Sequence, residues 1–284
     1  MLNMIKMDLY RMFRTKSFYV IWIVMLFLIA VTTYLSKTDY DLVMEETKTQ
    51  QEEIAETAAE DTEPVNLGMT VEMPTEPGEK VTVFDLFFAN TRGKFTGFIL
   101  VIFAVMFSTA DLNSGFIKNI GGQVQRRGNL IWSRAVALLV FTVLTMALFV
   151  VGQAISNRIF FGYLEWGNGK EFLQYFGIQA VLNFALVIIC MTIAILLRNN
   201  AVSMVIAICL TMNVMMVLYS AADKFLSRLG LEDFHLIEYT VTGKITLLPM
   251  APGAKECIGA LCIGAAFGIG LTAVSSLIFE KRDI

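Results

Sequence analysis

The chain has 284 residues, of which 56% are hydrophobic and 17% are charged, and its mean hydropathy is +0.64. In a soluble chain of this length about a quarter of the residues would be charged, so the composition excludes an ordinary soluble domain. Six apolar stretches approach the length needed to cross a hydrocarbon core of about 30 Å. They are residues 18–36, 95–110, 130–152, 172–197, 201–222 and 257–279. We therefore predict an all-α polytopic membrane protein with six transmembrane helices.

Residues 1–16 precede the first span and carry the pattern of an amphipathic helix. One arc of a helical wheel holds Leu2, Ile5, Leu9, Met12 and Phe13, and the opposite arc is polar and basic. Such a helix is expected to lie in the membrane interface, with its arginines toward the anionic headgroups. It is either a simple anchor or an elbow that touches a cytoplasmic partner, and the sequence leaves both interpretations open.

Lysine and arginine crowd into short segments on the side of the membrane that holds the N-terminus, and most acids fall on the other side. By the positive-inside rule, both termini are cytoplasmic. Residues 37–85 then form an acidic extracellular loop, and residues 223–256 form a second extracellular segment. The second span is short as drawn, so we expect it to begin near Leu86, with Arg92 and Lys94 snorkelling outward.

The apolar part of the second extracellular segment, residues 243–253, is broken by proline and glycine. This composition favours short re-entrant helices before the sixth span over another complete span. Residues 1–16 and 17–284 thus divide the chain into an interfacial helix and a single membrane domain.

Residues with catalytic or metal-binding chemistry are not grouped in this sequence. His235 is the only histidine, and no cysteines accompany it, so a zinc site is not expected. Two glycine–lysine pairs, at 169–170 and 243–244, lack the upstream glycine and following Ser/Thr of a phosphate-binding loop. No acidic pair lies inside the spans, which disfavours a proton-coupled carrier. We predict neither an enzyme nor a bound cofactor in this chain.

A methionine-rich stripe marks the fifth predicted span. Met204, Ile208, Met212 and Met215 fall on one helical face, with Asn213 beside them as a lone polar group. The stripe is either ordinary packing or an adaptable surface for varied apolar cargo, and both interpretations stay open.

A ridge of small residues marks the sixth span. Ala260, Gly264, Gly268 and Thr272 recur at a spacing of four, which allows another helix to approach closely. We expect the ridge to pack inside the subunit, and a subunit interface is the less favoured alternative.

The segment between the second and third spans, residues 111–129, is short, basic and punctuated by glycine. It contains Asp111 followed by Gly115-Phe116-Ile117-Lys118-Asn119 and then Arg126-Arg127. With the N-terminal helix, six spans and the outer segment before the sixth, it resembles the permease subunit of type-2 ABC exporters. The likeness is strongest to small bacterial permeases that export, or confer immunity to, peptide antibiotics and cytolytic peptides. In that family a threonine is common where Phe116 stands here.

The resemblance implies a bacterial plasma-membrane permease, expected as a homodimer, that works with two copies of a cytoplasmic ATPase, which bind the ATP and Mg. Residues 111–129 would hold the coupling helix, with Asp111 at its positive end. Gly115 would allow close approach of the ATPase. The polar and basic residues of the motif would contact the ATPase or lipid phosphates; they are Lys118, Asn119, Arg126 and Arg127.

The layout and the resemblance leave three candidate functions. The first is export of amphipathic peptides or similar hydrophobic compounds, with Met204, Ile208, Met212, Asn213 and Met215 along the pathway. The second is a peptide-sensing membrane module that signals to a cytoplasmic partner such as a kinase. The third, an intramembrane enzyme, is disfavoured by the missing catalytic groups. The identity of the cargo and the role of the acidic loop stay open.

Overall fold

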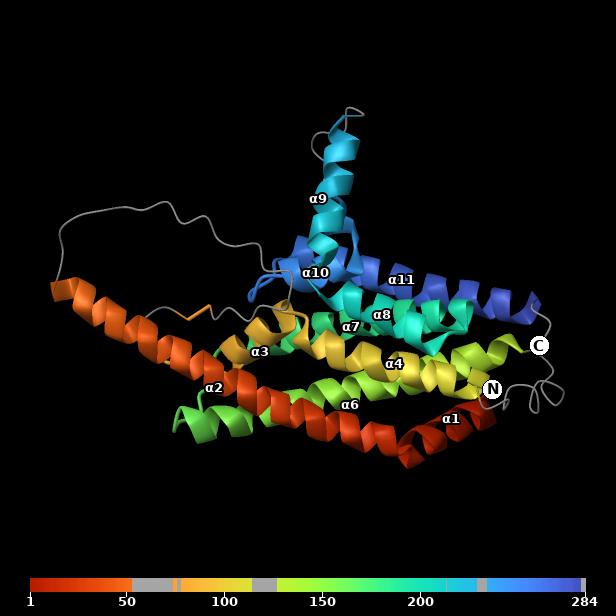
Figure 1. Cartoon of the computed structure of the whole chain (residues 1–284), viewed down its shortest axis with the longest axis horizontal. Helices are drawn as coiled ribbons and strands as arrows, with labels where there is room; N and C mark the ends of the chain where they lie inside the picture. Colours follow the sequence, from red (N-terminus) through yellow and green to blue (C-terminus); the bar gives the residue numbers. More distant parts are fainter. Residues whose placement is uncertain (53–73, 76–77, 114–126, 213, 229–233, 282–284) are drawn as a thin grey trace.

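The computed structural model describes residues 1–52, 74–75, 78–113, 127–212, 214–228 and 234–281. Within these ranges the chain is helical, and no strand occurs. The elements are α1 (Leu2–Arg14), α2 (Lys16–Glu52), α3 (Val83–Arg92), α4 (Phe95–Asn113), α6 (Gly128–Phe160), α7 (Gly169–Leu197), α8 (Asn200–Thr211), α9 (Val214–Ser227), η1 (Leu236–Tyr239), α10 (Val241–Leu247) and α11 (Ala254–Lys281). They form an elongated bundle from which α9 stands away (Figure 1).

Four helices are long and apolar enough to cross a membrane alone. They are α2 over Lys16–Leu42 and the whole of α6, α7 and α11. Two more candidates are bent helix pairs: α3 with α4, at an angle of 56°, and α8 with α9, at 73°. The described helices thus provide four to six candidate spans, and the prediction of an all-helical, membrane-embedded protein is confirmed at this level.

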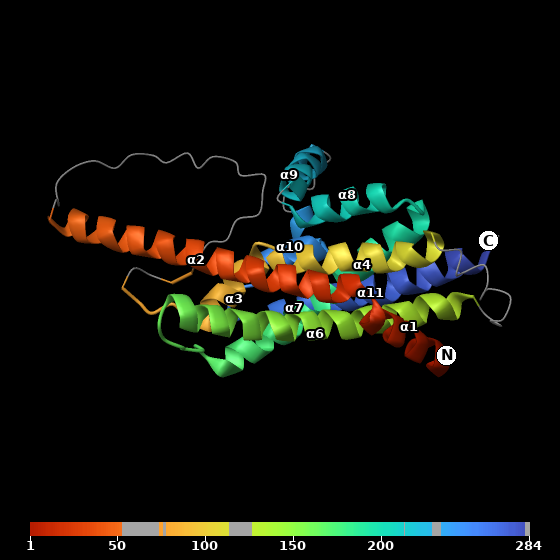
Figure 2. The same ribbon diagram turned by 60° about the horizontal axis from the view of Figure 1, so that its bottom comes forward.

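The bundle has two ends, which we call the α1 end and the α10 end. The α1 end holds the N-terminus, the last turns of α4 and α11 and the first turn of α6 (right side of Figure 1). The α10 end holds the starts of α3 and α7 together with α10. Helix α2 runs on past the α10 end, as the tilted view in Figure 2 also shows.

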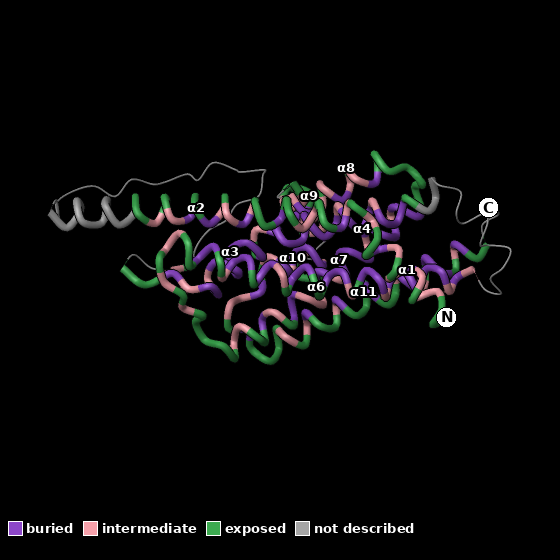
Figure 3. Tube along the Cα trace, turned by 90° about the horizontal axis from the view of Figure 1, so that it is seen from below, coloured by how far each residue is buried: buried purple, intermediate pink, exposed green. Residues whose placement is uncertain are grey.

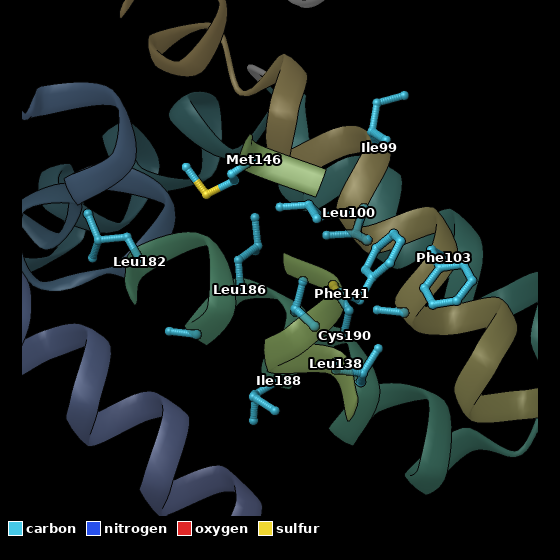
Figure 4. Close-up of a cluster of buried hydrophobic side chains, with 14 of the residues drawn as sticks. Ile99, Leu100, Phe103, Leu138, Phe141, Met146, Leu182, Leu186, Ile188 and Cys190 are labelled. Atoms are coloured by element: carbon cyan, nitrogen blue, oxygen red, sulfur yellow. The ribbon is translucent and has the colours of Figure 1, made fainter. Parts of the chain in front are cut away.

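The core lies where α4, α6 and α7 meet (Figure 4). Phe103 of α4 stacks on Phe141 of α6 with ring centroids 3.9 Å apart. Leu182 and Leu186 of α7 belong to the same fully buried cluster. Buried residues follow α7 and the facing sides of its neighbours, whereas the outer faces of α2 and α11 are exposed (Figure 3).

The small-residue ridge of α11 packs against α7, inside the subunit, as predicted. All four ridge residues are buried. A Cβ atom added to Gly264 would lie 2.8 Å from Cγ1 of Val181, and one added to Gly268 would lie 3.8 Å from the ring of Phe184. The glycines therefore let the two backbones approach closely, which maximises dispersion contacts in a medium as apolar as the helices themselves.

We predict that Gly264→Leu destabilises the protein by about 1–3 kcal/mol, because the new side chain overpacks the contact with Val181. Gly270→Leu is the matched control, since a Cβ at Gly270 meets nothing within 4 Å on the same helix. Thermal unfolding in one detergent compares the variants. Equal midpoints for the two would contradict the close packing of α11 on α7.

The first predicted span is longer than its apolar stretch. The apolar stretch ends at residue 36, but α2 continues without a break to Glu52. Residues 37–52 contain neither proline nor glycine, so nothing in the local sequence stops the helix. The remainder of the predicted acidic loop falls largely on residues 53–73 and 76–77, outside the described residues.

The second span begins earlier than its apolar stretch, as expected, but it is broken. Thr82 and Asp85 form a capping box that starts α3, and the chain turns at Gly93 before α4 begins. Lys94 there has a positive φ of 62°. The prediction that Lys94 snorkels outward is wrong: its side chain is only 2% exposed, because the bend turns it into the bundle. Arg92, two residues earlier, is exposed as predicted.

At the α10 end, residues 80–83 are attached to the α6–α7 connection. Lys80 Nζ lies 2.5 Å from Oε1 of Glu165, and the Val83 N–H donates to the Glu165 carbonyl at 2.8 Å. The Val81 N–H donates to the Tyr163 hydroxyl at 3.0 Å. The hydrogen bond from Lys80 to Glu165 raises the pKa of the lysine, and burial raises the pKa of the Tyr163 hydroxyl.

Both shifts predict a loss of stability in alkali. A group whose pKa is raised on folding stabilises the fold fully below its unfolded pKa and loses that contribution as the pH rises through the folded pKa. For these two groups the loss starts above about pH 10. Thermal midpoints between pH 9 and pH 11 should therefore fall less steeply in Tyr163→Phe than in wild type. Equal alkaline slopes would count against the shift at Tyr163.

Candidate functional site

The structure places the two helices that flank the predicted coupling segment. Asp111 lies in the last turn of α4, and Arg127 directly precedes α6. The other predicted coupling residues lie in 114–126, outside the described residues; they are Gly115, Lys118, Asn119 and Arg126. The described part of this candidate site therefore consists of the two helix ends at which the segment starts and finishes.

A buried arginine joins these two helix ends. Arg134 of α6 is 3% exposed, and its guanidinium Nη1 donates to the Ser108 carbonyl of α4 at 3.2 Å. Burying a guanidinium is costly unless it is hydrogen-bonded, so the contact holds the two helices in one relative position. In the sequence, Arg134 is recognisable only as a positive charge near the start of the third predicted span.

A second contact joins the end of α4 to the start of α8. The buried Thr109 hydroxyl lies 3.0 Å from Oδ1 of Asn200, the first residue of α8. The preceding Asn199 caps this helix, because its side chain accepts the Val202 N–H at 3.2 Å. A displacement of the last turns of α4 would therefore reach the first turn of α8.

Helix α1 is docked on α6 through a buried carboxylate. Asp8 is 2% exposed and accepts a hydrogen bond from the Ser133 hydroxyl, and Arg11 lies 3.8 Å from it on the same helix. The predicted amphipathic helix is confirmed, and its packed side includes part of the predicted apolar arc, since Leu9 and Met12 pack against the core. Met12 is buried beside Asp8, whereas Leu2 and Phe13 are exposed.

Helix α6 also starts in close contact with α11. A Cβ atom at Gly128 would lie 2.3 Å from Oγ of Ser276 and 2.8 Å from Oε1 of Glu280. Together these contacts form what we call the α1-end network, which joins α1, α4, α6, α8 and α11. Its members are Asp8, Ser108, Thr109, Gly128, Ser133, Arg134, Asn200 and Ser276.

The fifth predicted span is not one straight helix. After Thr211 the backbone of Met212 is extended, with φ −83° and ψ 159°, and the next helix points in another direction. Met204 and Ile208 are half-buried on α8, whereas Met215 lies on α9. The expectation of one continuous stripe is therefore wrong, because the helix ends between its members. Asn213 lies outside the described residues.

Helix α8 packs on α4 through a different face from the one that carries Met204 and Ile208. Its three buried residues, Ser203, Ala207 and Thr211, are small and recur every fourth position. A Cβ atom at Gly97 of α4 would lie 3.9 Å from Cγ2 of Thr211. Small residues on both helices thus allow a close approach. Such a ridge was predicted from the sequence for α11 but not for α8.

The segment before α11 contains a short helix, as predicted. The seven residues of α10 pack on α7, with Val241 and Ile245 buried. Gln179 of α7 donates to the Ile245 carbonyl at 3.1 Å, and the Tyr219 and Thr242 hydroxyls are hydrogen-bonded. The following prolines end the helix before α11. Its depth in the membrane stays a prediction.

No group of three metal-ligating side chains occurs in the part of the chain that the structure describes. His235 lies 3.7 Å from Asp223 on the surface, and among the described residues these two are not joined by a third candidate ligand. In comparisons with known proteins, the chain matches no protein-family model and no curated protein.

The Asp8–Ser133 contact is predicted to stabilise the docking of α1 by about 1.5–3 kcal/mol, the range for a hydrogen bond to a charged group. A double-mutant cycle with Asp8→Ala and Ser133→Ala, followed by thermal unfolding, measures this coupling. The matched control is the exposed Tyr10–Arg14 pair of the same helix, for which we expect coupling below about 1 kcal/mol. Additive effects of Asp8→Ala and Ser133→Ala would rule out a stabilising contact.

Proposed function

We propose that this chain is the membrane-spanning subunit of an ATP-driven exporter that moves amphipathic peptides outward. Its energy would come from a separate ATPase that contacts residues 111–129. The observation that carries the proposal is the α1-end network, which connects the two helices flanking the basic motif to three further helices. A permease needs such a connection, because force received at a loop must move the helices that line the pathway.

The layout that we propose treats each bent pair as one broken span, which makes six spans with the α1 end in the cytoplasm. The basic motif, Arg127 included, would then face the ATPase. Helix α1 would act as an elbow, since Asp8 anchors it to α6 near the residue at which the motif ends. A second copy of the chain would complete the transporter.

The cargo pathway is proposed to follow α8 and the bend after it. Met204 and Ile208 are half-buried and so reachable, and Met212 lies at the bend. The unbranched methionine side chains would adapt to apolar faces of different shape. Since Thr109 holds the start of α8 to α4, movement of α4 would tilt α8 and alter this surface.

The energy-coupling proposal is tested by Gly115→Trp combined with Arg126→Glu and Arg127→Glu. Bulk at Gly115 would push the ATPase away, and the reversed charges would repel an acidic partner surface. We expect an inserted protein that loses at least about tenfold of its co-purifying ATPase. The control reverses two exposed lysines on α7 and α9, Lys170→Glu and Lys224→Glu, and should retain the partner.

Full ATPase co-purification and peptide-stimulated hydrolysis in the loop variant would overturn the coupling assignment. A histidine kinase captured in place of an ATPase would instead favour the peptide-sensing module.

A further inference from the structure

An open groove of about 730 Å³ lies at the α10 end, between η1, α10 and the first turns of α11. Its size is that of a site for a small ligand or part of a lipid, not for a folded partner. Gly259 of α11 lines the groove, and an added Cβ atom there would meet nothing within 4 Å. The space beside this glycine is therefore open and not filled by a neighbouring side chain.

The groove changes from charged to apolar along α11. Lys255 and Glu256 lie in the first turn of the helix, and Ile258 and Ile263 line the groove further along. At a rise of about 1.5 Å per residue, Lys255 and Ile263 are separated by about 12 Å. Exposed Leu247 of α10 contributes to the apolar wall. Such a gradient matches the step from headgroup to acyl chain at a membrane surface.

The charged lining carries both signs in equal number. Lys244 and Lys255 supply two positive charges, and Glu238 and Glu256 supply two negative charges. Within the described residues, Glu256 accepts the Gly253 N–H at 2.8 Å, and no ion pair joins either lysine to either glutamate. The groove therefore offers separate donors and acceptors to a ligand that itself carries both charges.

We propose that this groove binds a zwitterionic phospholipid with a primary ammonium group, such as phosphatidylethanolamine. The lysines receive its phosphate and the glutamates its ammonium group. An acyl chain follows the apolar wall past Gly259. The most apolar part of α11 is only 22% buried by the rest of the chain, so lipid has direct access along the helix. This site does not depend on the transport function proposed above.

The test titrates the full chain in detergent with phosphatidylethanolamine or phosphatidylglycerol of matched acyl chains and counts bound lipid by native mass spectrometry. We expect phosphatidylethanolamine to bind about tenfold more tightly. Gly259→Phe fills the groove and should abolish that preference. Gly270→Phe is the matched control: its site on α11 is equally open but lies about 16 Å further along the helix, so binding should persist.

Equal binding of the two lipids to wild type, or full preference in Gly259→Phe, overturns the proposal. If Gly259→Phe does not fold, Glu238→Gln decides, since loss of an ammonium acceptor must reduce the preference. Displacement of the bound lipid by a cationic amphipathic peptide, with no lipid preference, would assign the groove to cargo and also refute the lipid site.

Discussion

The close approach of two helices to α7 is the constraint on which the rest of the bundle depends. A Cβ atom at Gly97 of α4 would lie 3.2 Å from Leu186, and one at Gly264 of α11 would lie 2.8 Å from Val181. Between helices in lipid, close packing replaces the exclusion of water as the main attraction, so these glycines set the order α4–α7–α11. Helix α8 then packs on α4 and α10 on α7, which fixes what each end of the bundle can hold.

Polar contacts fall into two groups with different consequences. The α1-end network is largely buried, so removing one partner leaves a desolvated group without compensation. The Lys80–Glu165 ion pair is exposed and screened by solvent, and it contributes less. Loss of one partner is consequently more costly in the α1-end network than at this ion pair.

The sequence was sufficient for features that depend on averages or on spacing within one helix. Hydropathy over about 20 residues located the four to six candidate spans of the described helices, and four-residue spacing identified the ridge at Gly264 that packs on α7. The bends could not be predicted in this way, because an average conceals the turn at Gly93 and the extended backbone of Met212. The burial of Asp8 could not be predicted from the sequence either, since its partner Ser133 lies 125 residues away. Of the candidate coupling residues, the structure describes only Asp111 and Arg127, at the two ends of the segment. The assignment of the others still depends on the sequence alone.

These features suggest how the two ends would communicate in the proposed exporter. Thr109 holds the start of α8 to α4, and the small face of α8 continues that contact as far as Thr211. At Met212 the helix ends, so α8 and α9 need not tilt together as one straight helix would. A push on the end of α4 would thus emerge as a change in the angle between α8 and α9, and α9 packs on η1 near the α10 end. The break that divides the methionine stripe is, on this argument, the hinge that the proposed pathway requires.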